Sequence, residues 1–187
     1  MAAAERLVFL GPPGSGKGTQ AVFVAESLGI PAISTGDMLR QAVAAGSELG
    51  KKVEGIMRSG TLVDDATMAD VVRARLSEED AREGFLLDGY PRTAGQADTL
   101  EGILRDAGQS LDAVVLLEVP EDEVVRRSLA RGRADDTEAT IRERQRIYRE
   151  DTAPLITEYR KQGILHRIDG HRSVDEVKEA ILAVLAS

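Results

Sequence analysis

The stretch Arg6–Thr19, RLVFLGPPGSGKGT, constrains the fold more than any other part of the chain. Its short apolar run, Arg6–Leu10, predicts a buried strand, and the residues that follow have the spacing of a helix. The glycines between the two leave backbone N–H groups free to point at an anion, and the positive N-terminal end of the helix adds to that attraction. The stretch therefore predicts a phosphate-binding turn between a strand and a helix.

This turn departs at one position from the phosphate-binding P-loop pattern G-x-x-x-x-G-K-[ST]. Gly11, Gly16 and Lys17 match, but Gly18 stands where the pattern has a hydroxyl residue, and Thr19 follows one place later. The alternative is a glycine-rich turn with an incidental lysine. The strand before it and the helix after it favour phosphate binding.

The rest of the chain alternates short apolar runs with helical patterns. Further strands are predicted at Pro31–Ser34, Gly84–Asp88, Asp112–Pro120 and Ile164–Asp169. The predicted helices are Gly16–Gly29, Asp37–Ala45, Ser47–Ser59, Asp64–Glu79, Thr93–Ala107, Glu121–Arg131, Thr137–Gln162 with a kink at Pro154, and Ser173–Ala186. Such alternation indicates a parallel sheet covered on both faces. We predict an α/β fold, a three-layer sandwich of the P-loop NTPase type with a five-stranded parallel sheet, in a single domain over residues 1–187.

Composition excludes several classes of function. The chain has 187 residues, a formal net charge of −8 and no cysteine, so disulfides and cysteine-based zinc sites are excluded. An acidic protein is a poor general binder of nucleic acid. No apolar run approaches the ~20 residues that span a bilayer, and the first residues lack the pattern of a signal peptide. We expect a cytoplasmic protein without a membrane or nucleic-acid partner, and a monomer because nothing in the sequence indicates an interface.

Ligands of such folds bind at the carboxyl ends of the strands. Four stretches follow predicted strands: Gly11–Thr19, Ser34–Arg40, Asp88–Arg92 and Gly170–Arg172. We expect these stretches to meet at one edge of the sheet.

The second stretch, STGDMLR, offers the Thr35 hydroxyl, a helix cap at Asp37 and the cation Arg40 one turn later. By itself it is more typical of a capped surface helix with a solvated arginine, because caps are common and such charges are usually solvated. Its position after a predicted strand makes it a candidate site.

The third stretch, GFLLDGYPR, places a carboxylate, Asp88, at the end of an apolar strand, as P-loop NTPases do near Mg²⁺. Gly89 permits close approach, Pro91 stiffens the turn, and Arg92 follows it. Asp, Gly and Pro also make ordinary turns. A strand that delivers both Asp and Arg beside a P-loop favours a functional role.

Positive charge gathers late in the chain. Eight arginines lie between residues 126 and 149: Arg126, Arg127, Arg131, Arg133, Arg142, Arg144, Arg146 and Arg149. Arg127 and Arg131 share a helix face, and Arg133 follows on the break at Gly132. The alternative is a surface of solvated ion pairs, which we expect for Arg126, Arg142, Arg146 and Arg149. An arginine cluster in an acidic protein indicates a small anionic ligand.

Taken in order, GPPGSGKGTQ, ISTGDMLR, GFLLDGYPRT with Gln96, GRADD and TAPLI resemble the adenylate kinases, a family of nucleoside monophosphate kinases. The resemblance covers essentially the whole chain. It implies reversible phosphoryl transfer from MgATP to AMP, which gives two ADP.

The resemblance also implies roles for individual residues. The implied ATP-binding residues are Gly14, Ser15, Gly16, Lys17, Gly18, Thr19, Arg131 and Arg172. The implied AMP-binding residues are Thr35, Arg40, Thr61, Leu62, Val63, Gly89, Tyr90, Pro91, Arg92, Gln96, Arg133 and Arg144. The implied catalytic residues are Lys17, Arg92, Arg127, Arg133 and Arg144.

In this family two mobile segments close over the substrates. Here they would be an NMP-binding segment at about 34–63 and a lid at about 130–136, which is too short for the extra β-rich piece of long-lid members. With Gly18 in the P-loop, no side chain is expected to bind Mg²⁺ directly. ATP oxygens and waters would hold the ion, oriented by Asp88 and Thr19. The alternatives are a UMP/CMP kinase of the same family and a nucleotide-binding regulatory ATPase.

Overall fold

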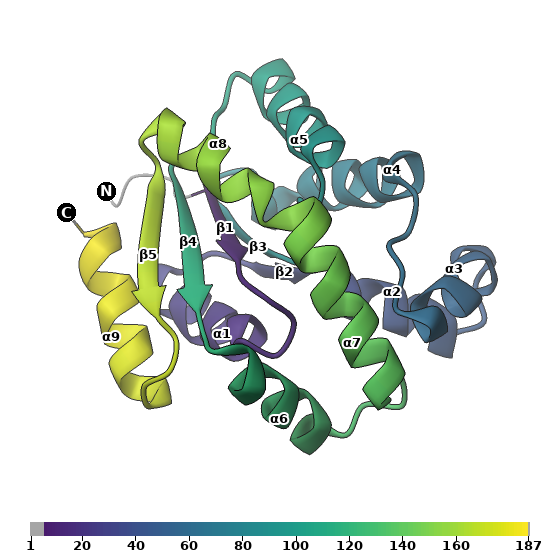
Figure 1. Ribbon diagram of the computed structural model, residues 1–187. Coiled ribbons are helices and arrows are strands. Elements are labelled where there is room, and N and C mark those ends of the chain that lie inside the picture. Colours follow the sequence, from purple (N-terminus) through teal and green to yellow (C-terminus); the bar gives the residue numbers. More distant parts are fainter. Residues whose placement is uncertain (1–5, 187) are drawn as a thin grey trace.

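The computed structural model describes residues 6–186, which form a five-stranded parallel sheet flanked by helices (Figure 1). The strands lie in the order β2-β3-β1-β4-β5, and every neighbouring pair is parallel. Their bounds are β1 Arg6–Leu10, β2 Ala32–Ser34, β3 Phe85–Asp88, β4 Ala113–Glu118 and β5 Leu165–Asp169. The predicted fold class and the five predicted strands are confirmed; β1 has the predicted bounds, and the ends of the other strands differ by at most two residues.

The register of the sheet brings the carboxyl ends of β1, β2 and β3 to one edge. Phe9 of β1 and Ser34 of β2 both lie beside Asp88 at the end of β3. The turn after β1 and the start of the helix after β2 therefore open onto the same space. This is where a ligand of a parallel sheet binds.

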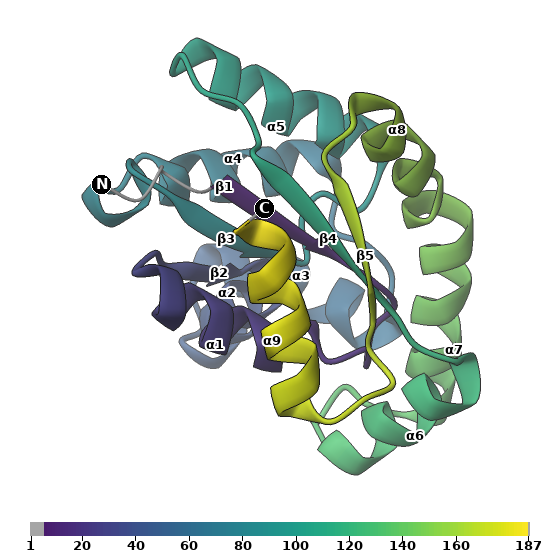
Figure 2. The same cartoon turned by 90° about the vertical axis from the view of Figure 1, so that its left-hand side faces the viewer.

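Alternate residues of the strands pack on opposite faces of the sheet, as the two-residue period of a strand requires. On one face, Leu7 and Phe9 of β1 pack with helices α1 (Lys17–Leu28) and α9 (Val174–Leu185). Figure 2 shows these two helices side by side. The C-terminal helix thus shares a core with the helix that begins at the phosphate-binding turn.

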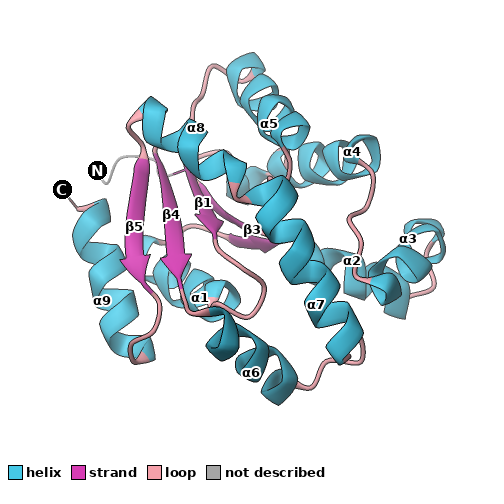
Figure 3. Cartoon of the chain, viewed as in Figure 1, coloured by secondary structure: helices cyan, strands magenta, loops and turns pink. Residues whose placement is uncertain are grey.

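The other face carries a larger apolar cluster. Val8 and Leu10 of β1 pack there with residues of α4 (Asp65–Leu76), α5 (Ala94–Asp106) and α8 (Pro154–Gln162). The remaining helices are α2 Thr35–Ala44, α3 Glu48–Ser59, the short 3-10 helix Glu79–Ala81, α6 Glu121–Arg131 and α7 Glu138–Ile147. Helices on both faces make the three predicted layers (Figure 3).

The predicted start of the helix after β2 is wrong by two residues. The side chain of Ser34 accepts the hydrogen bond from the Asp37 N–H and is the N-cap, so α2 begins at Thr35. Asp37 instead lies inside the first turn, where its carboxylate is free to pair with Arg40. Serine and aspartate are equally good caps, and the sequence alone does not separate them.

The long helix predicted at Thr137–Gln162 is present as two α-helices joined by a π-helical turn. Thr137 caps α7 as predicted, since its side chain accepts from the Thr140 N–H. A π-helical turn, Tyr148–Thr152, then leads to α8, which begins at Pro154. The interruption agrees with the kink predicted at the proline, because proline cannot donate a hydrogen bond inside a helix.

No helix within residues 6–186 has the length and apolar character needed to cross a membrane.

Candidate active site

A cavity of about 670 Å³ opens at the carboxyl edge of the sheet. Its volume is in the range typical of small-molecule sites. Most of the predicted site residues line it: Gly14, Gly16, Lys17, Gly18, Thr19, Thr35, Arg40, Thr61, Leu62, Val63, Asp88, Gly89, Pro91, Arg92, Gln96, Arg127, Arg131, Arg133 and Arg144. Residues far apart in the sequence therefore surround one space.

Three predicted site residues are not among the lining residues. Ser15 is buried in the turn, where its N–H donates to Pro12. Tyr90 is buried in the apolar cluster beneath the cavity. Arg172 is exposed, and its side chain pairs with Asp169 at 3.1 Å. Contact of these three side chains with a ligand in the cavity is not supported by this arrangement.

The phosphate-binding turn presents a lysine and a helix end to the cavity. Gly16 is the N-cap of α1, and no side chain caps this helix, so its first N–H groups face the ligand space. Lys17 Nζ donates to the carbonyls of Gly11 (2.8 Å) and Pro12 (3.1 Å). Burial lowers the Lys17 pKa from 10.5 to about 8, although Asp88 opposes the change. Lys17 therefore remains a cation at neutral pH.

The turn after β3 holds a half-buried arginine, Arg92. Gly89 has a φ of 88°, and a Cβ there would lie 2.8 Å from Thr35 Oγ1 and 3.0 Å from an Arg92 nitrogen. Only glycine lets both side chains come so close. Arg92 Nε donates to the Gly89 carbonyl at 2.7 Å, and Thr152 donates to the Arg92 carbonyl at 2.7 Å. Burial lowers the pKa of the Arg92 guanidinium, and Asp88 opposes this effect.

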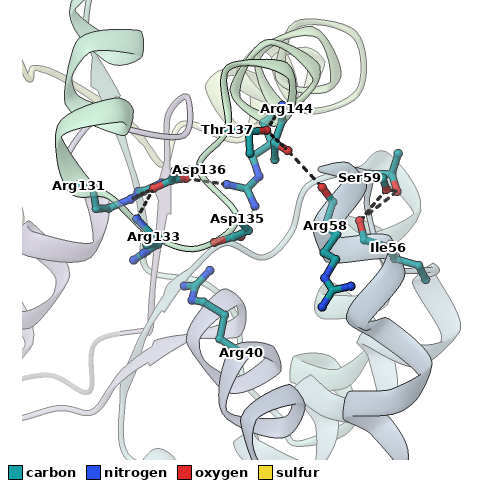
Figure 4. Close-up of polar contacts among 12 residues, drawn as sticks. Arg40, Ile56, Arg58, Ser59, Arg131, Arg133, Asp135, Asp136, Thr137 and Arg144 are labelled. Atoms are coloured by element: carbon teal, nitrogen blue, oxygen red, sulfur yellow. Dashed lines mark hydrogen bonds and ion pairs between the residues drawn. The ribbon is translucent and has the colours of Figure 1, made fainter.

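On the side of the cavity formed by α6, α7 and the loop between them, one carboxylate, Asp136, binds two of the arginines (Figure 4). Asp136 has no exposed side-chain surface, and it accepts hydrogen bonds from Arg131 at 2.8 and 2.9 Å and from Arg144 at 3.1 Å. Arg144 also pairs with Asp135. Burial by itself would raise the Asp136 pKa, but the hydrogen bond and charge of Arg131 lower it. Asp136 therefore stays ionised and fixes two guanidinium groups at the cavity.

Two further arginines, Arg40 on α2 and Arg133 in the loop between α6 and α7, lie on either side of Asp37. Figure 4 shows Arg40 pointing toward the loop that carries Arg133. Asp37 accepts from Arg40 Nε at 3.1 Å and lies 3.8 Å from an Arg133 nitrogen. Burial lowers the pKa of Arg133, and the charges of Arg40 and Arg131 lower it further. Like charges held this close favour an anion between them.

Arg127 connects the arginine wall to the phosphate-binding turn. Its side chain donates to Glu123 at 2.6 Å, to the Gly170 carbonyl at 3.2 Å and to the Ser15 carbonyl at 3.4 Å. These contacts cross from α6 to the turn before α1 and to the loop after β5. The fourth predicted strand-end stretch, Gly170–Arg172, thus touches the site through the Gly170 backbone.

The sequence does not identify as site residues the carboxylates that hold the arginines in place. Asp135 and Asp136 were visible in GRADD, but the sequence assigns them no specific partner. Glu123 stands four residues before Arg127 on α6, a spacing that permits an ion pair but does not show that it forms. Asp37 is expected only as a helix cap, and its contact with Arg133 joins two elements. The buried Thr152 carries no signal of its own, because its partner Arg92 lies in the turn after β3. The wall of the site is therefore a network of paired charges.

Within the part of the chain that the structure describes, no group of three or more histidines and acidic residues gathers in a way that could hold a metal ion. Asp88 lies beside the turn, since a Cβ on Gly18 would be 3.6 Å from its Oδ2. One carboxylate beside a phosphate-binding turn suits an ion that brings other ligands with it.

A parallel α/β sheet, a P-loop and a cavity walled by arginines define a nucleotide-binding enzyme of the P-loop class. Comparison with known proteins narrows this class. Residues 9–164 match the family model described as adenylate kinase. The chain is 53% identical to the adenylate kinase of Corynebacterium urealyticum, with 96% of this chain and 98% of the relative aligned.

Other relatives agree. Identity is 51% to adenylate kinase 1 of Synechocystis sp., with 95% of each chain aligned. It is 50% to the adenylate kinase of Thermobifida fusca, with 97% of this chain and 98% of the relative aligned. The chain belongs to the adenylate kinase family, and the resemblance noted in the sequence is confirmed.

Proposed function

We propose that this chain transfers the γ-phosphoryl group of MgATP to AMP, reversibly, and so forms two ADP. The observation that carries the proposal is the cavity, which is lined on one side by a P-loop with Lys17 and on the others by Arg92, Arg131, Arg133 and Arg144. The triphosphate of ATP and the phosphate of AMP together need several cations, and this cavity supplies them. The relatives reported above are all adenylate kinases, so they give a UMP/CMP kinase no support.

ATP would bind at the P-loop side. Backbone N–H groups of Gly14–Thr19 and the end of α1 would hold its phosphates, with Lys17 reaching the β- and γ-phosphates. Arg131 would cover the adenine, and Arg127 would lie near the ATP phosphates. The resemblance implies that the backbone near Arg172 contacts the adenine. The Arg172 side chain does not line the cavity and pairs with Asp169, so we propose no side-chain role for it.

AMP would bind between α2 and the turn after β3. Its phosphate would meet Arg40, Arg92, Arg133 and Arg144, which line the cavity together. Its base would lie near Gln96 and the Thr61–Val63 stretch, with Thr35 beside it. Tyr90 would contribute its backbone and its packing, because its side chain is buried.

The proposed reaction requires no general base. The attacking atom is an oxygen of the AMP phosphate, which is already an anion. It forms a bond to the γ-phosphorus while the bond from that phosphorus to the bridging oxygen of ATP breaks, and each side leaves as ADP. Charge spread over the transferring group is stabilised by Lys17 and the arginines, which are held in place before the reaction starts.

Water has to be kept away from the transferring group, or ATP would be hydrolysed. We propose that the NMP-binding segment, about 34–63, and the short lid, about 130–136, close over the two nucleotides. Both segments contribute cavity residues, Arg40 from the first and Arg133 from the second. Closure would bring these two arginines onto the phosphates.

Mg²⁺ would enter with ATP and neutralise part of the phosphate charge. Asp88 and Thr19 fit the role of orienting its waters, since both line the cavity beside the P-loop. We further propose that the enzyme works as a monomer in the cytoplasm.

An enzyme-coupled assay of ADP formation tests the proposal with AMP, CMP, UMP and GMP as acceptors. We expect AMP to give the highest kcat/KM, with two ADP formed for each ATP consumed. A higher kcat/KM for UMP or CMP would mean a pyrimidine nucleotide kinase. ATP consumption at the same rate without any acceptor would mean an ATPase.

A further inference from the structure

We propose that Asp65 is a specificity-determining positioning residue that locks the Gln96 amide in the orientation required by a 6-aminopurine. The inference rests on the proposed function and concerns how the acceptor base is selected. Asp65 does not line the cavity, and it acts through Gln96, which does.

The Gln96 amide is held from both ends. Its Nε2 donates to Asp65 Oδ1 at 3.0 Å, and its Oε1 accepts from the Arg92 N–H at 2.7 Å. Thr93 strengthens the arrangement, because its hydroxyl donates to Asp65 (3.3 Å) and accepts from the Gln96 N–H (3.1 Å). Gln96 as a residue is 2% exposed, so its side chain has little freedom to rearrange.

The chemistry of the two partners fixes which end of the amide is which. An ionised carboxylate only accepts hydrogen bonds, and a backbone N–H only donates. If the Gln96 amide were turned over, its oxygen would face the Asp65 carboxylate and its NH₂ group would face the Arg92 N–H. Both contacts would then be repulsive, so only one orientation is compatible with the structure.

That orientation leaves one lone pair on Oε1 and one hydrogen on Nε2 for a ligand. Oε1 can accept a hydrogen bond from an exocyclic amino group, and Nε2 can donate one to an unprotonated ring nitrogen. The edge of adenine presents these two groups side by side. A 6-oxopurine presents the reverse, a carbonyl oxygen and a ring N–H. It could pair with Gln96 only through the orientation that Asp65 opposes.

The fold brings the two residues together across 31 positions of sequence. Asp65 is the first residue of α4, and only the N-cap Asp64 separates it from the Thr61–Val63 stretch that lines the cavity. Gly95 makes room for its carboxylate, because a Cβ there would lie 2.9 Å from Asp65 Oδ2. The N-terminal ends of α4 and α5 therefore meet at the Gln96 amide.

The test compares kcat/KM for AMP and IMP, two acceptors of the same size that differ at this edge of the base. Asp65→Asn removes the charge and lets the side chain either accept or donate. Asp64→Asn is the matched control. It removes the same charge one residue away. There Asp64 caps α4 through the Thr67 N–H (2.8 Å), accepts from the Thr67 hydroxyl (2.8 Å) and lies 3.6 Å from Lys52 Nζ. Asparagine caps a helix as well as aspartate does.

We expect the wild-type preference for AMP over IMP to fall about tenfold in Asp65→Asn, which corresponds to about 1.4 kcal/mol. The control should keep the preference within about twofold. The ratio of two kcat/KM values cancels the concentration of active enzyme, so partial unfolding does not affect it. Asp65→Ala, which cannot accept at all, should narrow the preference at least as far, and Asp65→Glu should restore part of it.

An unchanged AMP:IMP ratio in both Asp65→Asn and Asp65→Ala, with a wild-type enzyme that prefers AMP, overturns the inference. An equal loss in Asp64→Asn also overturns it, since the effect would then be one of general charge. A wild-type enzyme that shows no preference for AMP instead contradicts the proposed function.

Discussion

Lys17 is expected to lower the stability of the nucleotide-free enzyme, and Lys17→Met should show this. Burial lowers the Lys17 pKa from 10.5 to about 8, which corresponds to ~3 kcal/mol of cost for keeping the charge in the folded state. Methionine removes this cost but also removes two hydrogen bonds, to Gly11 and Pro12, worth about 1 kcal/mol each. We expect the variant to be about 1 kcal/mol more stable than wild type at pH 7, although it is inactive.

The pH dependence makes the cause identifiable. Between pH 8 and 10.5 the unfolded chain keeps a proton on Lys17 that the folded chain has lost, so wild-type stability rises with pH in that window. The cost is fully present below pH 8. The difference between variant and wild type should therefore fall by about 2 kcal/mol from pH 7 to pH 9.5 and change sign.

Urea unfolding at pH 7 and pH 9.5, without nucleotide, measures both quantities. The comparison between two proteins cancels the titration of every other group. A variant that is less stable than wild type at pH 7, or a difference that does not move with pH, would refute the reasoning. Saturating ATP should stabilise wild type much more than the variant, because Lys17 is expected to bind the phosphates.

The other predictions concern the arginines and one close packing contact. Arg92→Ala should lower kcat about 10²–10³-fold in the assay of ADP formation, because it removes a pre-positioned cation; near-normal turnover would contradict its role. Arg40→Ala should mainly raise the KM for AMP, and an effect confined to ATP would reverse the site assignment. Gly60→Ala should destabilise by about 1–3 kcal/mol in urea, because its Cβ would lie 2.9 Å from Thr140 Cγ2. Gly46→Ala, with a similar φ and open space, is its control.

Much of the fold was predictable because its determinants are local. The alternation of apolar runs with helical spacing placed five strands and most helices, and Pro154 placed the interruption after α7. Local rules failed where two residues could do the same job. Ser34 and Asp37 can both cap α2, and the choice depends on the end of β2, which local spacing does not fix.

The sequence predicts which cations and glycines form the site. It does not predict the ion pairs and hydrogen bonds that connect them. Motif spacing brought Lys17 and Arg92 to one cavity because strand ends of a parallel sheet converge. The partners of those cations are set by tertiary packing. The contact between Asp136 and Arg144 spans eight residues and depends on the loop path, and the contact between Asp65 and Gln96 joins two helices. Tyr90 shows the converse, since the side chain of a residue within a motif can be buried in the apolar core.

The loop between α6 and α7 sets a mechanical limit on how the cavity opens. Six residues, 132–137, join the two helices, and a fully extended stretch of that length spans only about 20 Å. Asp136 shortens this tether further, because it ties the end of α6 to α7 through Arg131 and Arg144. While these ion pairs hold, the loop cannot swing as a free flap. We therefore expect wide opening on this side to carry the ends of α6 and α7 together.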